Sequence, residues 1–430
     1  MRLLIKNCRI ADAITDYGSK SDILIRDGIV EKIASGLDYE ADHIIDARGL
    51  YALPGFVDMH VHFREPGFEY KETVRTGSRS AAKGGYTSVC CMPNTRPVID
   101  NEKELIRLLE IIEAEACINV FPIAAISKEQ NGTELTDMSR LKQLGAVAFS
   151  DDGRPVHSDE LLRSALKTAK DNSLLLIDHC EDLKLVAGGV INEGQASKRL
   201  GLKGISALSE ELPIARDIQE AEMLDARIHI AHISTAGSAE LIRKAKQRGV
   251  KVTCEVTPHH LALSEDIIEQ GYTDCKVNPP LRTINDVQLL WKAVADGTVD
   301  VIATDHAPHS KEDKGEDFYI AAFGISGIET AFSVCFTTLV REGIIDIRRL
   351  TRIMSYNPAR ILGIDKGIIA EGKTADIVLV DTEKKVIIDK NSFVSKSSNT
   401  PFHGRSYYGE VVYTICNGML VYTNNNIKED

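Results

Sequence analysis

Eight short apolar segments recur through the middle of the chain, and they limit the possible folds more than any other feature of the sequence. They are GFVDMHVHF from Gly55, TSVCCMP from Thr87, INVFPIAAI from Ile118, AVAFS from Ala146, SLLLIDH from Ser173, RIHIAHIS from Arg227, KVTCEVTP from Lys251 and VDVIATDHAP from Val299. Continuous apolar runs of this length are typical of strands that are buried on both faces. We therefore expect eight parallel strands.

Stretches of helical character lie between these segments, such as NEKELIRLLEIIEAEA from Asn101, SDELLRSALKTAK from Ser158 and SAELIRKAKQRG from Ser238. Eight alternating strands and helices predict either a closed (β/α)8 barrel or a long doubly wound sheet. No glycine-rich dinucleotide fingerprint follows the first strand, which favours the barrel. The expected fold is therefore an α/β protein with a TIM barrel at residues 54–363.

The two ends of the chain have a different pattern from the middle. Residues 1–53 and 364–430 contain short strand-like segments separated by Gly or Asp turns, for example SDILIRDGIVEKIA, ADIVLVDTEKKVIID and EVVYTICNGMLVY. Both ends are expected to be antiparallel β structure. We predict one small β-sandwich domain, built from both termini and completed when the barrel brings its own ends together.

The amino-acid composition limits the kinds of molecule that this protein is expected to bind. The 430 residues include 63 acidic residues against 51 Lys plus Arg, which gives a formal net charge of -12. Such a surface is poorly suited to bind nucleic acid or anionic membranes, and no apolar stretch reaches the roughly 18 residues of a spanning helix. The nine cysteines are scattered, without zinc-site or redox spacing. We expect a cytoplasmic protein that acts on small molecules.

Polar residues cluster at the carboxyl ends of the predicted strands, where barrel enzymes place their reacting groups. They are His60, His62, Asp151, Asp152, His179, His232 and Asp305. Because side chains alternate along a strand, His60 and His62 point to the same side. One such histidine is more often structural, but four imidazoles and at least two carboxylates around one barrel mouth indicate a metal site.

Eight motifs resemble those of the dihydroorotases of the amidohydrolase superfamily, and within them the class I bacterial branch. They are DMHVHFREPG (58–67), MPNTRPV (92–98), FSDDG (149–153), DHCED (178–182), AHIST (231–235), EVTPHHL (255–261), NPPLR (278–282) and ATDHAPH (303–309). The resemblance covers nearly the whole chain. It implies reversible cyclisation of N-carbamoyl-L-aspartate to L-dihydroorotate in pyrimidine biosynthesis.

The resemblance also implies one or two Zn²⁺ ions per chain. His60 and His62 would bind the more buried ion, His179 and His232 the more exposed one, and Asp152 would bridge them. Asp305 would contact the buried ion and act as general acid and base toward a metal-bound hydroxide nucleophile. Zinc lowers the pKa of bound water to about 7, which makes such a nucleophile available at neutral pH.

Substrate contacts are implied by the same motifs. Positions matching the family's binding residues are His62, Arg64, Asn94, Asn278, His309, Phe323 and Gly324. The guanidinium of Arg64 suits a carboxylate, and the main chain at Phe323 and Gly324 would read the pyrimidine amides. The charged stretch SKEDKGEDFYIAA (310–322) is either a mobile lid or a solvated loop. A homodimer, or association with another pyrimidine-pathway enzyme, is possible.

Two alternatives stay open at this point. Many amidohydrolases bridge their metals with a carbamylated lysine, whereas this chain has FSDDG at that position. That difference separates it from hydantoinases, dihydropyrimidinases and allantoinases, which are the nearest alternative enzymes. The other alternative is a catalytically silent relative that serves as a partner subunit. Such relatives lose metal histidines, and here all four are present.

Overall fold

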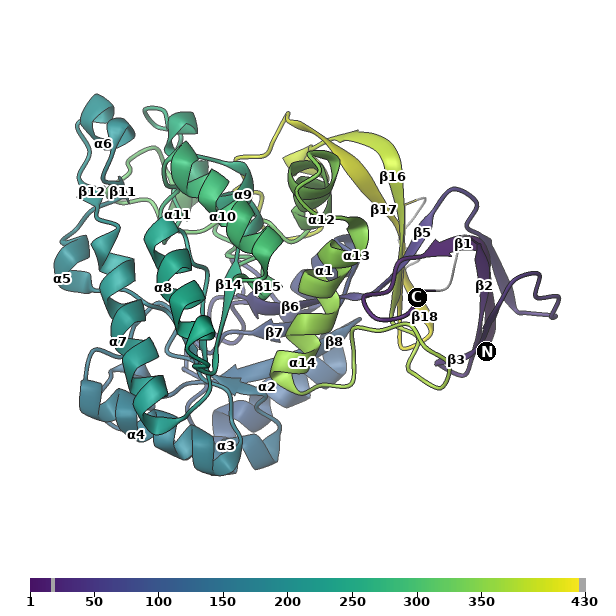
Figure 1. Ribbon diagram of the computed structural model, residues 1–430, viewed down its shortest axis with the longest axis horizontal. Helices are drawn as coiled ribbons and strands as arrows, with labels where there is room; N and C mark the ends of the chain where they lie inside the picture. Colours follow the sequence, from purple (N-terminus) through teal and green to yellow (C-terminus); the bar gives the residue numbers. More distant parts are fainter. Residues whose placement is uncertain (17–19, 425–430) are drawn as a thin grey trace.

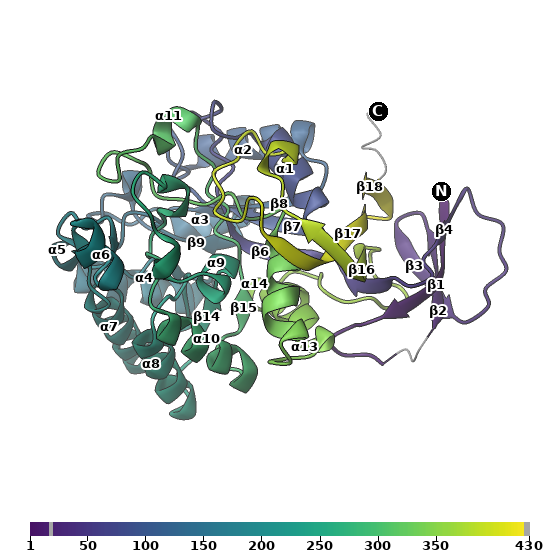
Figure 2. The same cartoon turned by 90° about the horizontal axis from the view of Figure 1, so that it is seen from above.

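The computed structural model describes residues 1–16 and 20–424, and its central feature is a closed barrel (Figures 1 and 2). The barrel strands are β6 (Phe56–Val61), β7 (Tyr86–Cys91), β8 (Asn119–Ala124), β9 (Ala148–Phe149), β10 (Ile177–Asp178), β13 (Ile228–Ile230), β14 (Val252–Val256) and β15 (Val301–Ile302). They form two parallel four-stranded sheets. Parallel bridges from Phe149 to Leu176 and from Val61 to His306 join these sheets into a ring. The predicted eight-stranded barrel is confirmed.

The helices lie outside this ring of strands. They are α1 (Val74–Lys83), α2 (Glu102–Glu115), α3 (Met138–Leu144), α4 (Asp159–Asn172), α5 (Leu183–Val186), α6 (Gln195–Leu200), α7 (Leu208–Leu224), α8 (Ala236–Gln247), α9 (Pro258–Ala262), α10 (Ile284–Asp296), α11 (Lys311–Lys314), α12 (Ala331–Cys335), α13 (Ile347–Thr351) and α14 (Asn357–Leu362). A short ribbon of β11 (Ile191–Asn192) and β12 (Gly204–Ile205) interrupts the connection between β10 and α7.

Helix α4 illustrates how the sequence defines these outer helices. The Ser158 side chain accepts a hydrogen bond from the backbone N–H of Leu161 at 3.2 Å and caps the helix start. Acidic residues occupy the first turn and a lysine the last, which suits the helix dipole. The buried residues Leu162, Ala165, Leu166 and Ala169 follow the spacing of a single helix face. That face packs against the barrel strands.

A second sheet contains strands from both ends of the chain. Its members are β1 (Arg2–Ile10), β2 (Ser21–Arg26), β3 (Ile29–Ala34), β4 (His43–Asp46), β5 (Tyr51–Pro54), β16 (Ile377–Ile387), β17 (Ser406–Cys416) and β18 (Met419–Thr423). Buried residues of the N-terminal strands, such as Ile5 and Ile25, share one core with Ile377 and Ile415 near the other end. Both termini therefore build one sheet, as expected.

One detail of that sheet differs from the sequence-based expectation of purely antiparallel pairing. Strand β1 pairs in parallel with both β4 and β5, while the pairs β1–β2, β5–β16 and β16–β17 are antiparallel. Strand β3 already runs in the direction of β1, and residues 35–42 return the chain to the end of the sheet where β1 begins, so β4 and β5 also run in that direction. The division into domains at residues 53/54 and 363/364 stays a prediction.

The terminal sheet packs directly on the barrel. Val378 and Val380 of β16 belong to the same apolar core as Phe56 of β6 and Tyr86 of β7. The backbone of Gly85 approaches this contact closely: a side chain there would lie 2.9 Å from both Phe56 and Val378, and its φ of +88° favours glycine. The sheet therefore supports the strand that carries His60 and His62.

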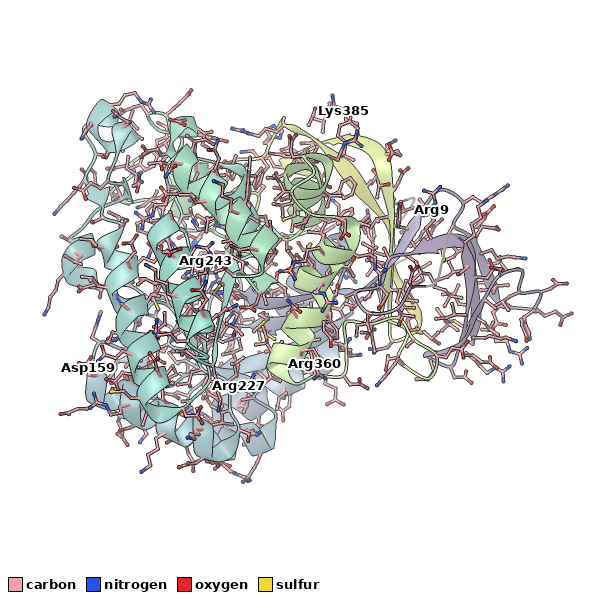
Figure 3. All side chains as sticks on the ribbon, in the orientation of Figure 1. Arg9, Asp159, Arg227, Arg243, Arg360 and Lys385 are labelled. Atoms are coloured by element: carbon pink, nitrogen blue, oxygen red, sulfur yellow. The ribbon has the colours of Figure 1, made fainter. Side chains whose placement is uncertain are left out.

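Charged side chains cover the outside of the molecule. Figure 3 shows examples on well-separated elements, with Asp159 at the start of α4 and Lys385 on β16, and both side chains are exposed. Within residues 1–16 and 20–424, none of the helices is long and apolar enough to cross a membrane.

We predict that the terminal sheet depends on its shared core. Ile377→Ala removes a side chain with no exposed surface from the contact between β5, β16 and β17, so it is expected to lower the free energy of unfolding by about 2–5 kcal/mol. Ile387→Ala, on the same strand but 69% exposed, is the matched control and should change it by about 0.5 kcal/mol or less. Urea denaturation measures both, and equal effects would contradict this account of the core.

Candidate metal centre

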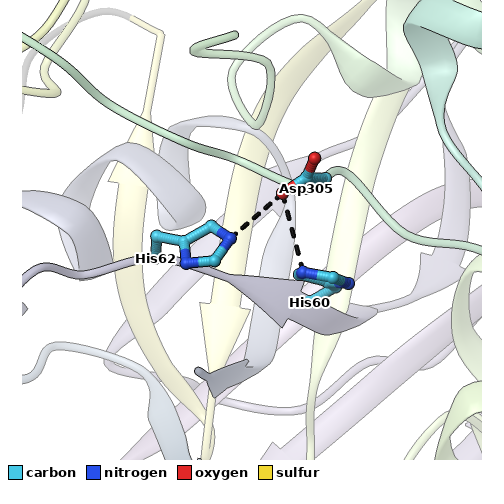
Figure 4. Close-up of side chains that lie close together, drawn as sticks. All are labelled: His60, His62 and Asp305. Atoms are coloured by element: carbon cyan, nitrogen blue, oxygen red, sulfur yellow. Dashed lines mark hydrogen bonds and ion pairs between the residues drawn. The ribbon is translucent and has the colours of Figure 1, made fainter. Parts of the chain in front are cut away.

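Six potential metal ligands converge at the carboxyl ends of the barrel strands. His60 lies on β6 and His62 directly follows it, while Asp152, His179, His232 and Asp305 follow β9, β10, β13 and β15. All six side chains are buried. Figure 4 shows the imidazoles of His60 and His62 on one side of their strand, both directed at the carboxylate of Asp305. The period-two spacing therefore has the predicted geometric consequence.

The carboxylate of Asp152 lies at the centre of the cluster and faces all four imidazoles. Its distances to the nearest ring nitrogens are 3.3 Å for His60 Nε2, 3.6 Å for His62 Nε2, 3.4 Å for His179 Nδ1 and 3.7 Å for His232 Nε2. Asp305 is on one side only, 3.1 Å from His62 Nε2 and 3.6 Å from His60 Nε2. Asp152 is therefore close to all four imidazoles, whereas Asp305 is close only to those of His60 and His62.

Hydrogen bonds on the outer side of three of the four rings, those of His60, His62 and His179, determine which nitrogen faces inward. His60 Nδ1 donates to Glu255 Oε1 at 2.7 Å, and His62 Nδ1 donates to Asn94 Oδ1 at 3.0 Å. His179 Nε2 lies 3.4 Å from Glu181 Oε2. A neutral imidazole that donates from one nitrogen has a lone pair on the other. The inward nitrogens of these rings are therefore available as metal ligands.

The donor set fits a divalent metal ion. His60 Nε2 is buried and makes no hydrogen bond, although two carboxylates lie nearby. A lone pair facing carboxylate oxygens is unfavourable unless a cation lies between them. Within this cluster, two groups of three side chains have ligand atoms within 4.8 Å of one another, namely His60, His62 and Asp305, and His60, Asp152 and His232. Imidazole and carboxylate ligands in this mixture suit zinc or a similar ion.

The ionisation states of the two carboxylates, Asp152 and Asp305, also favour metal binding. Burial raises the pKa of Asp152, but the charge of His60 and the hydrogen bonds from His179 and His232 outweigh it and hold that pKa well below the usual range. For Asp305, burial is likewise outweighed by the hydrogen bond from His62 and by nearby imidazoles, so its pKa is lowered. Burial lowers the pKa of His62. For His60 and His179, burial is outweighed by neighbouring carboxylates, which raise the pKa of both rings. Metals bind ionised carboxylates and neutral imidazoles, so a metal ion at His60 and His179 would displace the protons of these two rings.

A cavity of about 240 Å³ opens above these ligands. The predicted residues that line it are His62, Arg64, Asn94, Asp152, His179, His232, Asn278, Asp305, His309, Phe323 and Gly324. Only His60 among the predicted site residues lies below the cavity wall, where it is fully buried. The structure thus brings the predicted metal and substrate residues into one place, and their individual roles stay predictions.

The substrate side of the cavity is organised around His309. Lys71 Nζ lies 3.3 Å from His309 Nδ1 and can only donate, so the proton of a neutral ring is on Nε2. That nitrogen donates to the Phe323 carbonyl at 2.9 Å, and Arg64 lies beside it at 3.1 Å. In the described part of the chain no carboxylate lies within ion-pair distance of Arg64. Burial lowers its pKa to about 10, so it is a cation at neutral pH.

Three residues that line the cavity have left-handed backbone conformations, which are uncommon for residues other than glycine. The φ angles are 62° for Arg64, 29° for His232 and 46° for Asp305. Each costs of order 1–3 kcal/mol, and such angles persist where surrounding structure enforces them, often at functional sites. The barrel therefore holds the ends of three strands in the orientation that directs their side chains into the cavity.

Two acidic residues of the site were missed by sequence reasoning. Glu255 of β14 binds His60 and lies 3.1 Å from His229 Nε2, and Glu181 binds both His179 and the Asn278 amide. The available signal for Glu255 was a charged residue inside the apolar segment KVTCEVTP. Burial raises its pKa, but the charge of His60 and hydrogen bonds from both histidines lower it to about 2.

The structure also distinguishes the two adjacent aspartates. Asp151 Oδ1 accepts hydrogen bonds from the backbone N–H groups of Ile126 and Ser127 at 2.9 and 3.1 Å. Its side chain thereby faces the loop after β8 and not the imidazoles. Asp152 is the residue of the pair that faces the cluster.

Comparison with known proteins gives a consistent picture. Residues 49–238 match the family described as "Dihydro-orotase-like". The chain is 49% identical to a dihydroorotase of Caldanaerobacter subterraneus, over 99% of this chain and 98% of the relative. It is 48% identical to a dihydroorotase of Ruminiclostridium cellulolyticum, over 98% of each.

Solved structures share the fold over the same length. The chain superposes on the L-hydantoinase (dihydropyrimidinase) of Arthrobacter aurescens with a TM-score of 0.90 and 25% identity, covering 100% of this chain and 97% of the other. A dihydropyrimidinase of Brevibacillus agri gives a TM-score of 0.85 at 25% identity, covering 99% and 96%. The barrel and the terminal sheet are therefore a shared architecture.

The hydrogen bond from His60 to Glu255 leads to a prediction about metal affinity. Glu255→Gln removes the charge that holds the His60 ring, and we expect affinity for zinc to fall about 10–100-fold in a competition titration with a fluorescent chelator. Glu265→Gln is the control, because Glu265 is similarly buried but binds Asn192 and Gln195, away from the cluster. Equal affinities for Glu255→Gln and the unchanged protein would refute the role of Glu255.

Proposed function

This chain belongs to the dihydroorotase family, and from that premise we propose that it is a zinc-dependent enzyme which interconverts N-carbamoyl-L-aspartate and L-dihydroorotate. It is a cyclic amidohydrolase: the bond broken in hydrolysis is an amide C–N bond within a ring. The observation that supports the proposal most is the carboxylate of Asp152 facing four imidazoles, with Asp305 and Arg64 lining the same cavity.

We assign the ligands as the family resemblance implies, with one or two zinc ions per chain. His60, His62 and Asp305 would hold the deeper ion and His179 and His232 the outer one, while the carboxylate of Asp152, which faces all four imidazoles, would be available to both. A bound zinc ion acts as a Lewis acid that polarises a carbonyl and lowers the pKa of water. Proton transfer and substrate binding are carried out by residues of the chain.

Asp305 is the proposed general acid and base. Its ionised carboxylate can accept the proton that the attacking water loses, and in the same turnover it returns that proton to the ring nitrogen as the C–N bond breaks. In the direction of ring closure it removes a proton from the carbamoyl nitrogen. Its position 3.1 Å from His62 Nε2 keeps the carboxylate at the base of the cavity.

Arg64 and the residues around His309 are the proposed substrate contacts. The Arg64 guanidinium, without a carboxylate partner of its own, suits the substrate carboxylate, and Asn94 and His309 are close enough to assist. Asn278 donates its amide N–H to Glu181 at 2.8 Å, so its amide oxygen is the group that remains for a ring N–H.

We propose that the main chain at Phe323 and Gly324 forms hydrogen bonds with the amide groups of the substrate ring. The Gly324 N–H donates to the Lys276 carbonyl and the Phe323 carbonyl accepts from His309. Within the described residues the Phe323 N–H has no such acceptor. We therefore assign the contact with a substrate carbonyl to the amide of Phe323.

The finer assignments rest on particular residues. We propose the class I branch because Asp152 occupies the bridging position and, among described residues, no lysine lines the cavity. A hydantoinase, dihydropyrimidinase or allantoinase activity is the second candidate, and the similar solved structures are enzymes of the first two kinds. A silent partner subunit is disfavoured by the complete ligand set. Homodimer formation, a pathway-enzyme partner and cytoplasmic localisation stay predictions.

Substrate preference tests this proposal directly. Purified protein with zinc is expected to consume L-dihydroorotate, followed by its ultraviolet absorbance, with a kcat/KM at least about tenfold above that for hydantoin or allantoin. Metal content is measured on the same sample. Failure to turn over dihydroorotate with one or two zinc ions per chain would exclude the enzyme, and faster hydantoin hydrolysis would select the second candidate.

The role of Asp305 is tested by Asp305→Asn, which keeps the shape but cannot carry the proton. We expect kcat to fall by about 10²–10⁴-fold while circular dichroism is unchanged. Asp151→Asn is the matched control, because that carboxylate is equally buried but faces the loop after β8, and its kcat should stay within about threefold of the unchanged enzyme. A near-normal rate in Asp305→Asn would refute the assignment.

A further inference from the structure

The segment between His309 and Gly324 carries the substrate-facing turn but belongs to no strand. It contains the four-residue helix α11, then a coil in which Tyr319 and Ile320 are 55% and 82% exposed. A coil with so much exposed surface needs contacts elsewhere to hold one conformation. Thr273, Lys203 and Asn399 each supply a hydrogen bond to it, and two buried lysines, Lys276 and Lys314, supply five more.

Lys314 uses its ammonium group entirely on main-chain carbonyls. Its Nζ donates to the carbonyl oxygens of Lys276, Ala322 and Gly324 at 3.1, 2.9 and 3.1 Å. An ammonium group has three N–H donors, so all three are satisfied. The side chain is 4% exposed, and the group lies under the turn that lines the cavity.

Lys276 binds the same segment from the other side. Its Nζ donates to the carbonyl oxygens of Phe318 and Ala321 and lies 4.1 Å from the centre of the Phe323 ring, a cation–π contact. Its own carbonyl accepts hydrogen bonds from the Gly324 N–H and from Lys314 Nζ. The two lysines thus gather the carbonyls of residues 318, 321, 322 and 324.

Neither lysine has a carboxylate partner within ion-pair distance among residues 1–16 and 20–424. Burial lowers the pKa of both ammonium groups to about 8, which reflects the loss of hydration. An apolar side chain of similar length would fill the same space without that desolvation cost. The reason for two buried ammonium groups is therefore their hydrogen bonds. They bind backbone carbonyls of a segment that has no neighbouring strand to bind them.

The side-chain hydrogen bonds of this turn lead to the substrate side of the site. The Phe323 carbonyl accepts from His309, which lies beside Arg64, and the Gly324 carbonyl also accepts from Asn399 Nδ2 at 2.9 Å. None of these contacts involves the six metal ligands. A shift of the turn would displace the substrate-binding groups and leave the metal centre in place.

We propose that Lys276 and Lys314 are positioning residues for substrate binding: together they hold residues 318–324 in the shape that presents Phe323, Gly324 and His309 to the substrate. This inference rests on the proposed dihydroorotase function for the identity of that substrate. It replaces both earlier interpretations of the 310–322 stretch, the mobile lid and the solvated loop, with a segment clamped from beneath.

Lys276→Met and Lys314→Met test the proposal, because methionine keeps most of the side-chain volume and removes the donors. For each variant we expect KM for dihydroorotate to rise at least about tenfold, with kcat within about threefold and zinc content unchanged. Lys246→Met is the control. Lys246 also donates to a carbonyl, that of Thr298, but near the amino end of β15 at the opposite end of the barrel, and its KM should stay unchanged.

A second measurement does not depend on turnover. Chymotrypsin is expected to cut after the exposed Tyr319 at least about tenfold faster in Lys314→Met than in the unchanged protein or in Lys246→Met. If the unchanged protein has no dihydroorotase activity, the proposed function is wrong. The cleavage rates still show whether Lys314 holds residues 318–324 in place. An unchanged KM in both methionine variants overturns the positioning role. So does failure of both variants to fold, because the lysines would then serve global stability.

Discussion

The balance of charge around Asp152 is the interaction on which the rest of the site depends. A carboxylate with almost no exposed surface faces four imidazoles, and it is tolerable in a barrel interior only because those groups and a cation compensate it. The imidazoles come from three different strands. Closure of the barrel is therefore the event that assembles the centre, and no single segment of the chain carries it.

Around this centre the structure separates two tasks. Glu255, Glu181 and Asn94 each bind the outer nitrogen of one imidazole and so fix the inner nitrogen toward the metal. Their positions at strand ends make that side rigid. The proposed substrate contacts lie instead on loops, where His309 accepts a hydrogen bond from Lys71 and donates one to the Phe323 carbonyl. The two tasks therefore depend largely on different residues, and Asn94 is the one that contacts a metal-site imidazole and also lines the cavity.

The apolar segments were enough to predict eight strands, and the spacing of His60 and His62 was enough to predict a shared direction. Other features depend on pairings that local sequence does not encode. Glu255 meets His60 from a strand far along the chain, and the parallel pairing of β1 with β4 and β5 depends on the path of residues 35–42, which return the chain after β3. Lys314 resembles an ordinary surface lysine within SKEDKGEDF, and only the folded turn reveals its burial.

The sheet shared by the two chain ends has a consequence for biosynthesis. Strand β5 pairs with β16, and nearly the whole barrel is encoded between them. On the ribosome, β5 leaves the exit tunnel long before its partner exists and presents the unpaired edge that promotes aggregation. Barrel formation shortens the loop that must close before β16 can dock. A strand made after the barrel therefore protects the edge of a strand made before it.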